Sequence, residues 1–207
     1  MTTSPFVLPP HYLVTPEPTS NALLSGSVSS THSFYLAALE AALARGITLV
    51  QLRARTLDAQ AYRRLATDVL RCCHRHGARL LLNAAPELAL SLHADGVHLT
   101  STRLMACTQR PLPADFLVSA ACHDETQIRH ATQLGVDLLT VSPVLPTKTH
   151  SNAIPLGWSR FSTLVALTSV PVYALGGMRI ESLAEAQQAG ARGIAAIRAF
   201  WGEDVIS

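Results

Sequence analysis

The chain is poor in charge and in aromatic residues. Only 14% of its 207 residues are charged and 5% are aromatic, while 48% are hydrophobic. This composition excludes a disordered chain, which needs many charges and few apolar residues. The formal net charge is only +2, so no general field attracts nucleic acid or an anionic membrane, and few rings are present to stack on bases. We therefore expect neither nucleic acid nor a membrane among its partners.

Long apolar runs and paired cysteine motifs are also missing. No run reaches the roughly 18 residues of a membrane helix. The N-terminal segment has no basic region and is interrupted by prolines, unlike a secretory signal. The four cysteines, Cys72, Cys73, Cys107 and Cys122, show no CxxC spacing. We expect a cytoplasmic protein with reduced thiols.

The chain does contain eight short apolar runs that alternate with segments of helical period. The predicted strands are 11–15, 47–53, 79–83, 96–100, 116–122, 138–144, 170–176 and 193–200. They are almost continuously apolar, as strands buried on both faces are. Four of the helical segments between them end in glycine, at Gly46, Gly77, Gly135 and Gly190, the residue that ends helices in the left-handed conformation.

Eight alternating units most simply close into a (β/α)8 TIM barrel, with an open doubly wound sheet as the competing architecture. We expect a single domain over 1–207 with its core at about 11–200. Residues 16–31 are predicted to form a loop. Only WGEDVIS follows the eighth predicted strand, so the eighth helix is missing or truncated. The exposed flank then needs a cover, which is the N-terminal segment, a second copy of the chain in a homodimer, or another domain.

In either architecture the residues that do chemistry lie at the carboxyl ends of the strands. The candidates found there include four arginines and a lysine, and no carboxylate was found among them; Asp95 precedes its strand and belongs at the opposite end. The candidates are Gln51, Arg53, Arg55, Asn83, His98, Thr100, Ser101, Arg103, Cys122, His123, Thr147, Lys148, Thr149, His150, Gly176, Gly177 and Arg198. A cationic mouth with a Gly-Gly turn after the seventh strand predicts a phosphate ligand.

Several of these segments together resemble one known family. QLRAR, LLLN, GVHLT, the SAACH segment, DLLTVSPVLPTKTH, PLGW, PVYALGGM and AGARGIAAI resemble, in this order, the thiamine phosphate synthase and TenI family. The resemblance covers about residues 11–200. Within the family the chain looks most like the TenI-like barrel that follows some Nudix (MutT-type) hydrolases, although no Nudix box is present. A Nudix domain is therefore one candidate for the partner that covers the flank.

The resemblance implies a (β/α)8 barrel and one of two reactions. Synthases join a pyrimidine pyrophosphate to a thiazole phosphate with Mg²⁺, whereas TenI-type members shift a double bond in the thiazole phosphate by proton transfer. Gln51 and Arg53 match positions that contact the pyrophosphate in the family. Arg55 stands where Lys is usual, and Asn83 matches the Asn of an Asn-Asp pair.

The two carboxylates that hold the metal in the family are absent. Ala84 replaces the Asp of the Asn-Asp pair, and Arg103 stands at the last position of the GVHLGQxD pattern. Mg²⁺ prefers carboxylate oxygens and is poorly placed beside a guanidinium. We therefore predict no metal ligands and no cofactor, and Mg²⁺ is expected only if the synthase reaction is retained.

The half of the site that holds the thiazole phosphate in the family matches the family pattern more closely. Thr147, Thr149, Gly176 and Gly177 match family positions, whereas His150 replaces the final Lys of the P-T-x-T-K loop and Lys148 occupies its variable position. Arg198 replaces a small residue. It either binds a phosphate in a bidentate manner or fills the pocket.

His123 stands where TenI-type tautomerases have their catalytic histidine, and a neutral imidazole can move a proton near pH 7. The alternative is a histidine that only forms a hydrogen bond at the rim. His98 is predicted to be a wall residue of the pocket, and Cys122 a packed thiol.

These residues predict a protein of thiamine metabolism that binds a phosphorylated thiazole or thiamine-type ligand, with a metal-independent thiazole phosphate tautomerase as the enzyme hypothesis. The alternatives are a Mg²⁺-dependent thiamine phosphate synthase and a non-catalytic binding module associated with a Nudix hydrolase. Another phosphate-binding barrel, such as an epimerase, is disfavoured because its acid and base carboxylates are not among the candidates.

Overall fold

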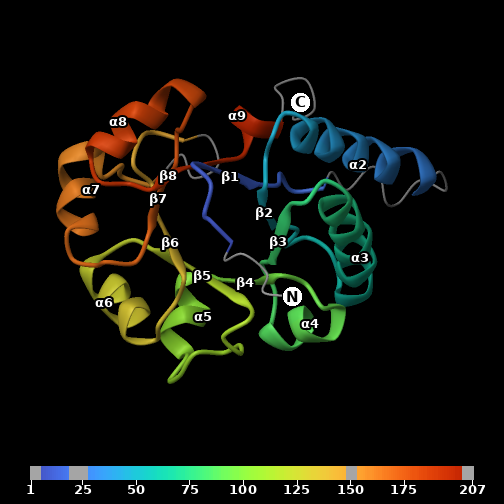
Figure 1. The fold of residues 1–207 in the computed structure, drawn as a ribbon, viewed down its shortest axis with the longest axis horizontal. Coiled ribbons are helices and arrows are strands. Elements are labelled where there is room, and N and C mark those ends of the chain that lie inside the picture. The colour runs from blue at the N-terminus through green and yellow to red at the C-terminus, as the bar shows by residue number, and fades with distance from the viewer. Residues whose placement is uncertain (1–5, 19–27, 148–152, 202–207) are drawn as a thin grey trace.

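Eight parallel strands form a closed barrel in the order β1-β2-β3-β4-β5-β6-β7-β8 (Figure 1). The computed structural model describes residues 6–18, 28–147 and 153–201. The strands are β1 His11–Val14, β2 Leu49–Leu52, β3 Arg79–Leu82, β4 Gly96–Leu99, β5 Leu117–Cys122, β6 Leu138–Val141, β7 Val172–Leu175 and β8 Gly193–Ala196. β8 pairs with β1, with Tyr12 opposite Ala195. The predicted (β/α)8 barrel is thus confirmed, and the open-sheet alternative is wrong.

A helix follows each strand and lies on the outside of the barrel (Figure 1). The helices are α2 Val28–Ala44, α3 Ala59–Arg75, α4 Pro86–Leu92, α5 Ser101–Ala106, α6 Glu125–Gln133, α7 Gly157–Val165, α8 Leu183–Gln188 and α9 Arg198–Trp201, with the 3-10 helix η2 Ile180–Ser182 before α8. Within the described residues, none of these helices has the length and apolarity needed to cross a membrane.

Most boundaries agree with the sequence patterns to within two residues, with three corrections. The sixth strand was predicted at 138–144, but β6 ends at Val141. The eighth strand was predicted at 193–200, but β8 ends at Ala196 and Arg198 begins α9. The loop predicted at 16–31 is too long, because α2 begins at Val28. The four glycines predicted to end helices all have positive φ angles, of 93°, 67°, 68° and 93° in chain order, as left-handed helix ends do.

The barrel has two apolar cores, one on each face of its sheet. The interior core is small and contains side chains from several of the strands, including Tyr12, Leu49, Leu81, Leu138 and Tyr173. The larger core lies between the strands and the surrounding helices and includes Leu13, Val50, Leu80 and Val97. Successive side chains of a strand point to opposite faces, so continuous apolar runs supply both cores.

The eighth helix is present as α9, which has four residues among those described. Two aromatic residues of α9 cover the flank between β8 and β1. Trp201 and Phe200 are 2% and 4% exposed, and the Trp201 ring lies 4.8 Å from that of Tyr35 on α2. The Phe200 ring lies 5.1 Å from His11. The aromatic side chains of α9, packed against α2 and β1, therefore cover this flank.

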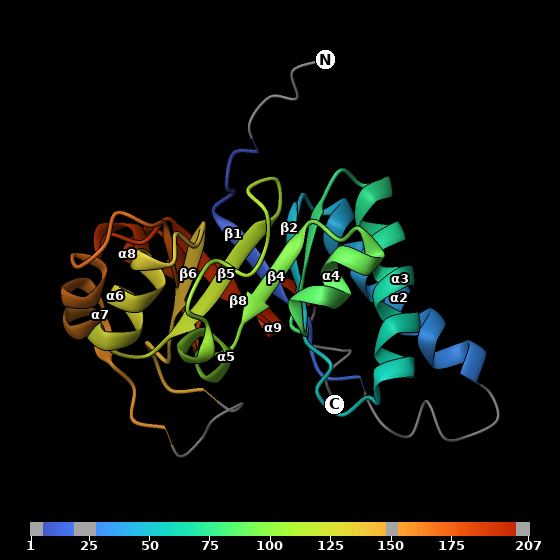
Figure 2. The same cartoon turned by 90° about the horizontal axis from the view of Figure 1, so that it is seen from below.

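Residues 6–10 lie elsewhere, at the amino ends of the strands (Figure 2). Tyr173 Oη donates a hydrogen bond of 2.6 Å to the Pro9 carbonyl, and Arg192 Nε donates to the Leu8 carbonyl at 2.8 Å. Phe6 and Leu8 pack against the interior core. This segment therefore covers one end of the barrel, and the carboxyl ends of the strands are left for a ligand.

Candidate functional site

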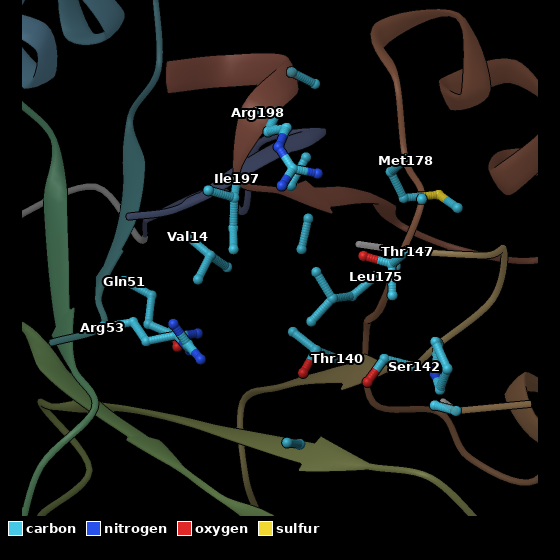
Figure 3. A pocket seen from close by; sticks show the side chains of 18 of the residues that line it. Val14, Gln51, Arg53, Thr140, Ser142, Thr147, Leu175, Met178, Ile197 and Arg198 are labelled. Atoms are coloured by element: carbon cyan, nitrogen blue, oxygen red, sulfur yellow. The ribbon is translucent and has the colours of Figure 1, made fainter. Parts of the chain in front are cut away.

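A pocket of about 1480 Å³ opens at the carboxyl ends of the strands. It exceeds the roughly 300–1,000 Å³ of typical small-molecule sites. The predicted residues that line it are Gln51, Arg53, Arg55, Asn83, His98, Thr100, Ser101, His123, Thr147, Gly176, Gly177 and Arg198. Three further candidates, Lys148, Thr149 and His150, lie outside the described residues. Figure 3 shows Gln51, Arg53, Thr140, Thr147 and Arg198 around one space.

A chain of neutral hydrogen bonds links β1, β2 and the end of β3. Asn83 Nδ2 donates to Gln51 Oε1 at 3.1 Å, and Gln51 Nε2 donates to Tyr12 Oη at 3.2 Å. Arg103 extends from α5 and donates to Asn83 Oδ1 at 3.4 Å. Gln51 is only 2% exposed, so this chain fixes the orientation of both amides at the wall of the pocket.

His98 is a buried, neutral residue among those that line the pocket. It is 4% exposed, and its Nδ1 lies 2.9 Å from Ser119 Oγ. Burial lowers the pKa of His98 to about 3, and the charge of Arg103 acts in the same direction. The imidazole is therefore uncharged near pH 7 and can only take part in neutral hydrogen bonds. Thr140, from β6, is fully buried, and its Oγ1 has no partner among the described residues.

The expectation that no carboxylate lies at the strand ends is wrong. Glu17, three residues after β1, and Glu181 in η2 both line the pocket. Glu17 Oε2 forms an ion pair of 3.0 Å with Arg53 Nη1. Its Oε1 accepts hydrogen bonds from Thr56 N at 2.7 Å and from Thr56 Oγ1 at 3.0 Å. Glu17 lies in a segment rich in proline and serine, and its one sequence signal is its place shortly after the first strand.

The guanidinium groups differ in their surroundings. The side chain of Arg53 is 14% exposed, and its pKa is lowered by burial and by the charge of Arg55, while Glu17 acts in the opposite direction. Arg55 is exposed. Arg198, at the first position of α9, is exposed and extends toward the pocket (Figure 3). Arg198 is therefore an exposed residue of the pocket lining.

The Gly176-Gly177 turn after β7 needs both glycines. Their φ angles are 98° and 70°. A Cβ at Gly176 would lie 2.8 Å from Pro143 Cα, and one at Gly177 would lie 2.6 Å from the Pro146 carbonyl oxygen. The turn therefore packs directly against the segment after β6, which brings backbone close to Thr147. Glycine turns of this kind allow backbone N–H groups to approach an anion.

His123 is held in one tautomer. Its Nδ1 lies 2.7 Å from the Ser142 carbonyl oxygen, and a carbonyl can only accept, so Nδ1 carries the hydrogen. Nε2 of the neutral ring is then unprotonated. The backbone N–H of His123 donates to Gln127 Oε1 at 2.8 Å. His123 is exposed and lines the pocket.

Cys122 precedes His123 but faces away from the pocket. It is fully buried, and burial raises the pKa of its thiol to about 12. The packed thiol predicted from the sequence is confirmed, since a thiol with this pKa is protonated near pH 7 and is a poor nucleophile.

The donor set of the pocket does not fit the magnesium ion that the family resemblance implies. Ala84 is buried and offers no oxygen from its side chain, and Arg103 brings a positive charge to Asn83. Glu17 is already bound to Arg53 and Thr56. Within the described residues no group of three His, Cys, Asp or Glu side chains could hold a metal ion.

The fold and the pocket define a class: a (β/α)8 barrel with its site at the carboxyl ends of the strands, where guanidinium groups, a glycine turn and a histidine meet. The family model described as thiamine monophosphate synthase matches residues 24–200. The chain belongs to this family.

Several known proteins are similar to the chain. A thiamine-phosphate synthase of Thermus thermophilus is 37% identical over 163 residues, which are 78% of each chain. A thiamine-phosphate synthase of Synechocystis is 34% identical over 174 residues, 84% of this chain and 51% of that protein. Among solved structures, thiamine phosphate pyrophosphorylase from Pyrococcus furiosus has a TM-score of 0.71 at 21% identity and covers 94% of this chain and 89% of its own. That likeness shows the fold.

Proposed function

We propose that the pocket binds a phosphorylated thiazole or thiamine-type compound and that the protein isomerises thiazole phosphate by metal-independent proton transfer. The observation that carries the enzyme hypothesis is the geometry of His123. The Ser142 carbonyl fixes its Nδ1–H, so an unprotonated Nε2 is available in a residue that lines the pocket. A fixed neutral imidazole is the side chain best suited to move a proton near pH 7.

The phosphate group has a separate place in this proposal. Backbone N–H groups at Gly176 and Gly177, the side chain of Thr147 and the guanidinium of Arg198 would hold it, since all four residues line the same pocket. Guanidinium groups and N–H groups of a glycine turn are suitable donors to phosphate oxygens. The phosphate would then anchor the thiazole ring without taking part in the reaction.

The reaction itself needs no co-reactant. His123 Nε2 takes a proton from one ring carbon of the thiazole phosphate isomer, and the electron pair of that C–H bond moves the double bond. The imidazolium then returns the proton at the other end of the shifted double bond. The product is an isomer of the substrate, so atoms and electrons balance. The Ser142 carbonyl, which accepts from Nδ1–H, stabilises the imidazolium between the two transfers.

The second candidate is the coupling reaction named in the relatives, thiamine-phosphate synthase. It is supported by those names and by Gln51 and Arg53, which line the pocket. The residues at 84 and 103 oppose it, because they supply a methyl group and a guanidinium where metal-binding carboxylates are needed.

Calorimetric titration with thiamine phosphate, in EDTA and in excess Mg²⁺, tests the binding proposal. We expect saturable binding of equal affinity in both conditions. Binding that requires Mg²⁺ would instead support the synthase reaction, and the absence of binding in both conditions would contradict the proposal. Proton NMR of the thiazole phosphate isomer, incubated with the protein in D₂O and EDTA, then tests turnover through isomerisation and loss of the exchanged signal.

Two further alternatives stay predictions. A non-catalytic module would bind thiamine phosphate but give no NMR turnover. A homodimer or a Nudix-domain partner also stays a prediction, and analytical ultracentrifugation of the pure chain tests the first of these.

A further inference from the structure

Glu17 is a firmly held carboxylate inside a pocket that is otherwise lined mainly by cations and neutral groups. Three donors fix it: Arg53 Nη1 at 3.0 Å, Thr56 N at 2.7 Å and Thr56 Oγ1 at 3.0 Å. Its side chain is 27% exposed. An ion pair between long, freely exposed side chains contributes little, but this pair is partly buried and its carboxylate is tied to backbone.

Glu17 pairs with only one of the two arginines that lie on either side of β1 in the pocket. Arg53 follows β2 and Arg198 follows β8, and β1 pairs with both of these strands. Figure 3 shows Val14, at the end of β1, between the two arginines. Glu17 follows this middle strand and neutralises Arg53, whereas Arg198 has no ion-pair partner among the described residues.

The two sides of the pocket therefore offer different sites to an anion. On the β7–β8 side, Arg198 and the Gly176-Gly177 turn present donors, and Arg179 and Glu181, which follow the turn, also line the pocket. On the β2 side, an anion that reaches Arg53 meets the Glu17 carboxylate at hydrogen-bond distance from the same guanidinium. Like charges at such distances repel strongly when they are partly shielded from water.

We propose that Glu17 is a specificity-determining residue, which admits ligands with a single phosphate on the β7–β8 side and disfavours a pyrophosphate that extends to Arg53. The inference rests on the proposed phosphate site and concerns which anions this site accepts. Glu17 acts through Arg53 and through its own charge, and it is not assigned a part in proton transfer.

The alternative is that Glu17 only ties the segment after β1 to the segment after β2. Glu17→Gln separates the two roles, because the amide oxygen still accepts from Thr56 while the negative charge is removed. Glu40→Gln is the matched control. Glu40 also pairs with an arginine, Arg75 at 3.4 Å, and lies on α2 outside the pocket, so this variant changes the net charge equally.

The experiment is calorimetric titration of the two variants and the unchanged protein with inorganic pyrophosphate, inorganic orthophosphate and thiamine phosphate, all in EDTA. We expect Glu17→Gln to bind pyrophosphate about tenfold more tightly, the change that about 1.4 kcal/mol gives. We expect its affinities for orthophosphate and thiamine phosphate to change less than about threefold, and Glu40→Gln to match the unchanged protein. In the double variant Glu17→Gln, Arg53→Gln the gain should disappear, because the freed guanidinium is its source.

Two results would overturn the specificity role alone. They are an unchanged pyrophosphate affinity in Glu17→Gln and an equal gain for orthophosphate, in each case with thiamine phosphate still bound. If no variant binds any of the three anions, the proposed phosphate site fails together with the inference. Thermal unfolding of each variant shows whether an affinity change reflects a change in fold.

Discussion

The Nδ1 atom of His123 lies 2.7 Å from the backbone carbonyl oxygen of Ser142. The two residues follow β5 and β6, whose parallel register places Cys122 opposite Val141. The residue after each strand therefore lies at the same height in the barrel. The imidazole is oriented by the neighbouring strand and not by a carboxylate, and this contact places the hydrogen of the neutral ring on Nδ1.

Replacement of His123 by alanine tests its part in proton transfer. We expect His123→Ala to lower isomerisation of thiazole phosphate by about 10²–10⁴-fold, the usual range for loss of a general base. Binding of thiamine phosphate should change less than about threefold, since the phosphate donors lie on other strands. The measurements are the NMR turnover assay and calorimetry, with His76→Ala, at the end of α3, as control. Unchanged turnover in His123→Ala would refute this role.

The lowered pKa of His98 predicts a loss of stability in acid. The ordinary pKa is 6.5 and the folded value is about 3, so between these values the unfolded chain binds a proton that the folded chain does not. The free energy of unfolding therefore falls as the pH falls from 6.5 toward 3, by up to about 1.4 kcal/mol per pH unit. Above pH 6.5, His98 adds no pH dependence.

Urea unfolding of the unchanged protein and of His98→Gln, from pH 8 to pH 4, measures this contribution. Carboxylates titrate over part of the same range, so the difference between the two proteins is the relevant quantity. We expect the free energy of unfolding of His98→Gln to fall less steeply below pH 6.5, because this variant lacks the imidazole. Parallel curves for the two proteins would show that His98 is not the group responsible.

The glycine turn after β7 should tolerate no side chain. Gly176 and Gly46 have φ angles of 98° and 93°, so alanine at either costs about 1 kcal/mol in backbone strain. At Gly46 a Cβ meets nothing within 4 Å, whereas at Gly176 it would lie 2.8 Å from Pro143 Cα. We expect Gly176→Ala to lose about 1–3 kcal/mol more than Gly46→Ala and to weaken binding of orthophosphate. Equal urea midpoints for both variants would contradict this expectation.

Asp95 supports the end of the barrel opposite the pocket. Its side chain is 5% exposed and accepts from Arg79 Nη1 at 2.6 Å and from Leu80 N at 2.8 Å. Asp95→Ala leaves a backbone N–H and a guanidinium without this partner, so we expect a loss of about 2–4 kcal/mol. Glu40→Ala, which breaks an exposed pair, should cost at most about 1 kcal/mol. Thermal and urea unfolding measure the stability of the two variants. A similar loss of stability in both would show that Asp95 contributes no more than an exposed ion pair.

The strands were predictable because burial on both faces leaves a simple signal, a short apolar run followed by a turn residue. The last boundary was not, because GIAAI and the following RAF form one nearly continuous apolar run, although the chain changes from β8 to α9 between Ala196 and Arg198. In that run the aromatic residues pack against α2 and β1, a contact that no local pattern encodes.

The candidate site was largely predictable because the carboxyl end of each strand can be located once its apolar run is recognised in the sequence. Glu17 was missed because it lies beyond β1 in an irregular segment, and its contact with Arg53 joins residues 36 apart in the chain. The tautomer of His123 could not be predicted from the sequence either, because it depends on the carbonyl of Ser142, which follows the next strand. Such pairings become visible only when the barrel is closed.

The pairing of β8 with β1 has a consequence for biosynthesis. The two strands come from opposite ends of the chain, so the ribosome must release residues 193–196 before the ring can form. Until then β1 and β7 each present an unpaired edge, to which another nascent chain can attach.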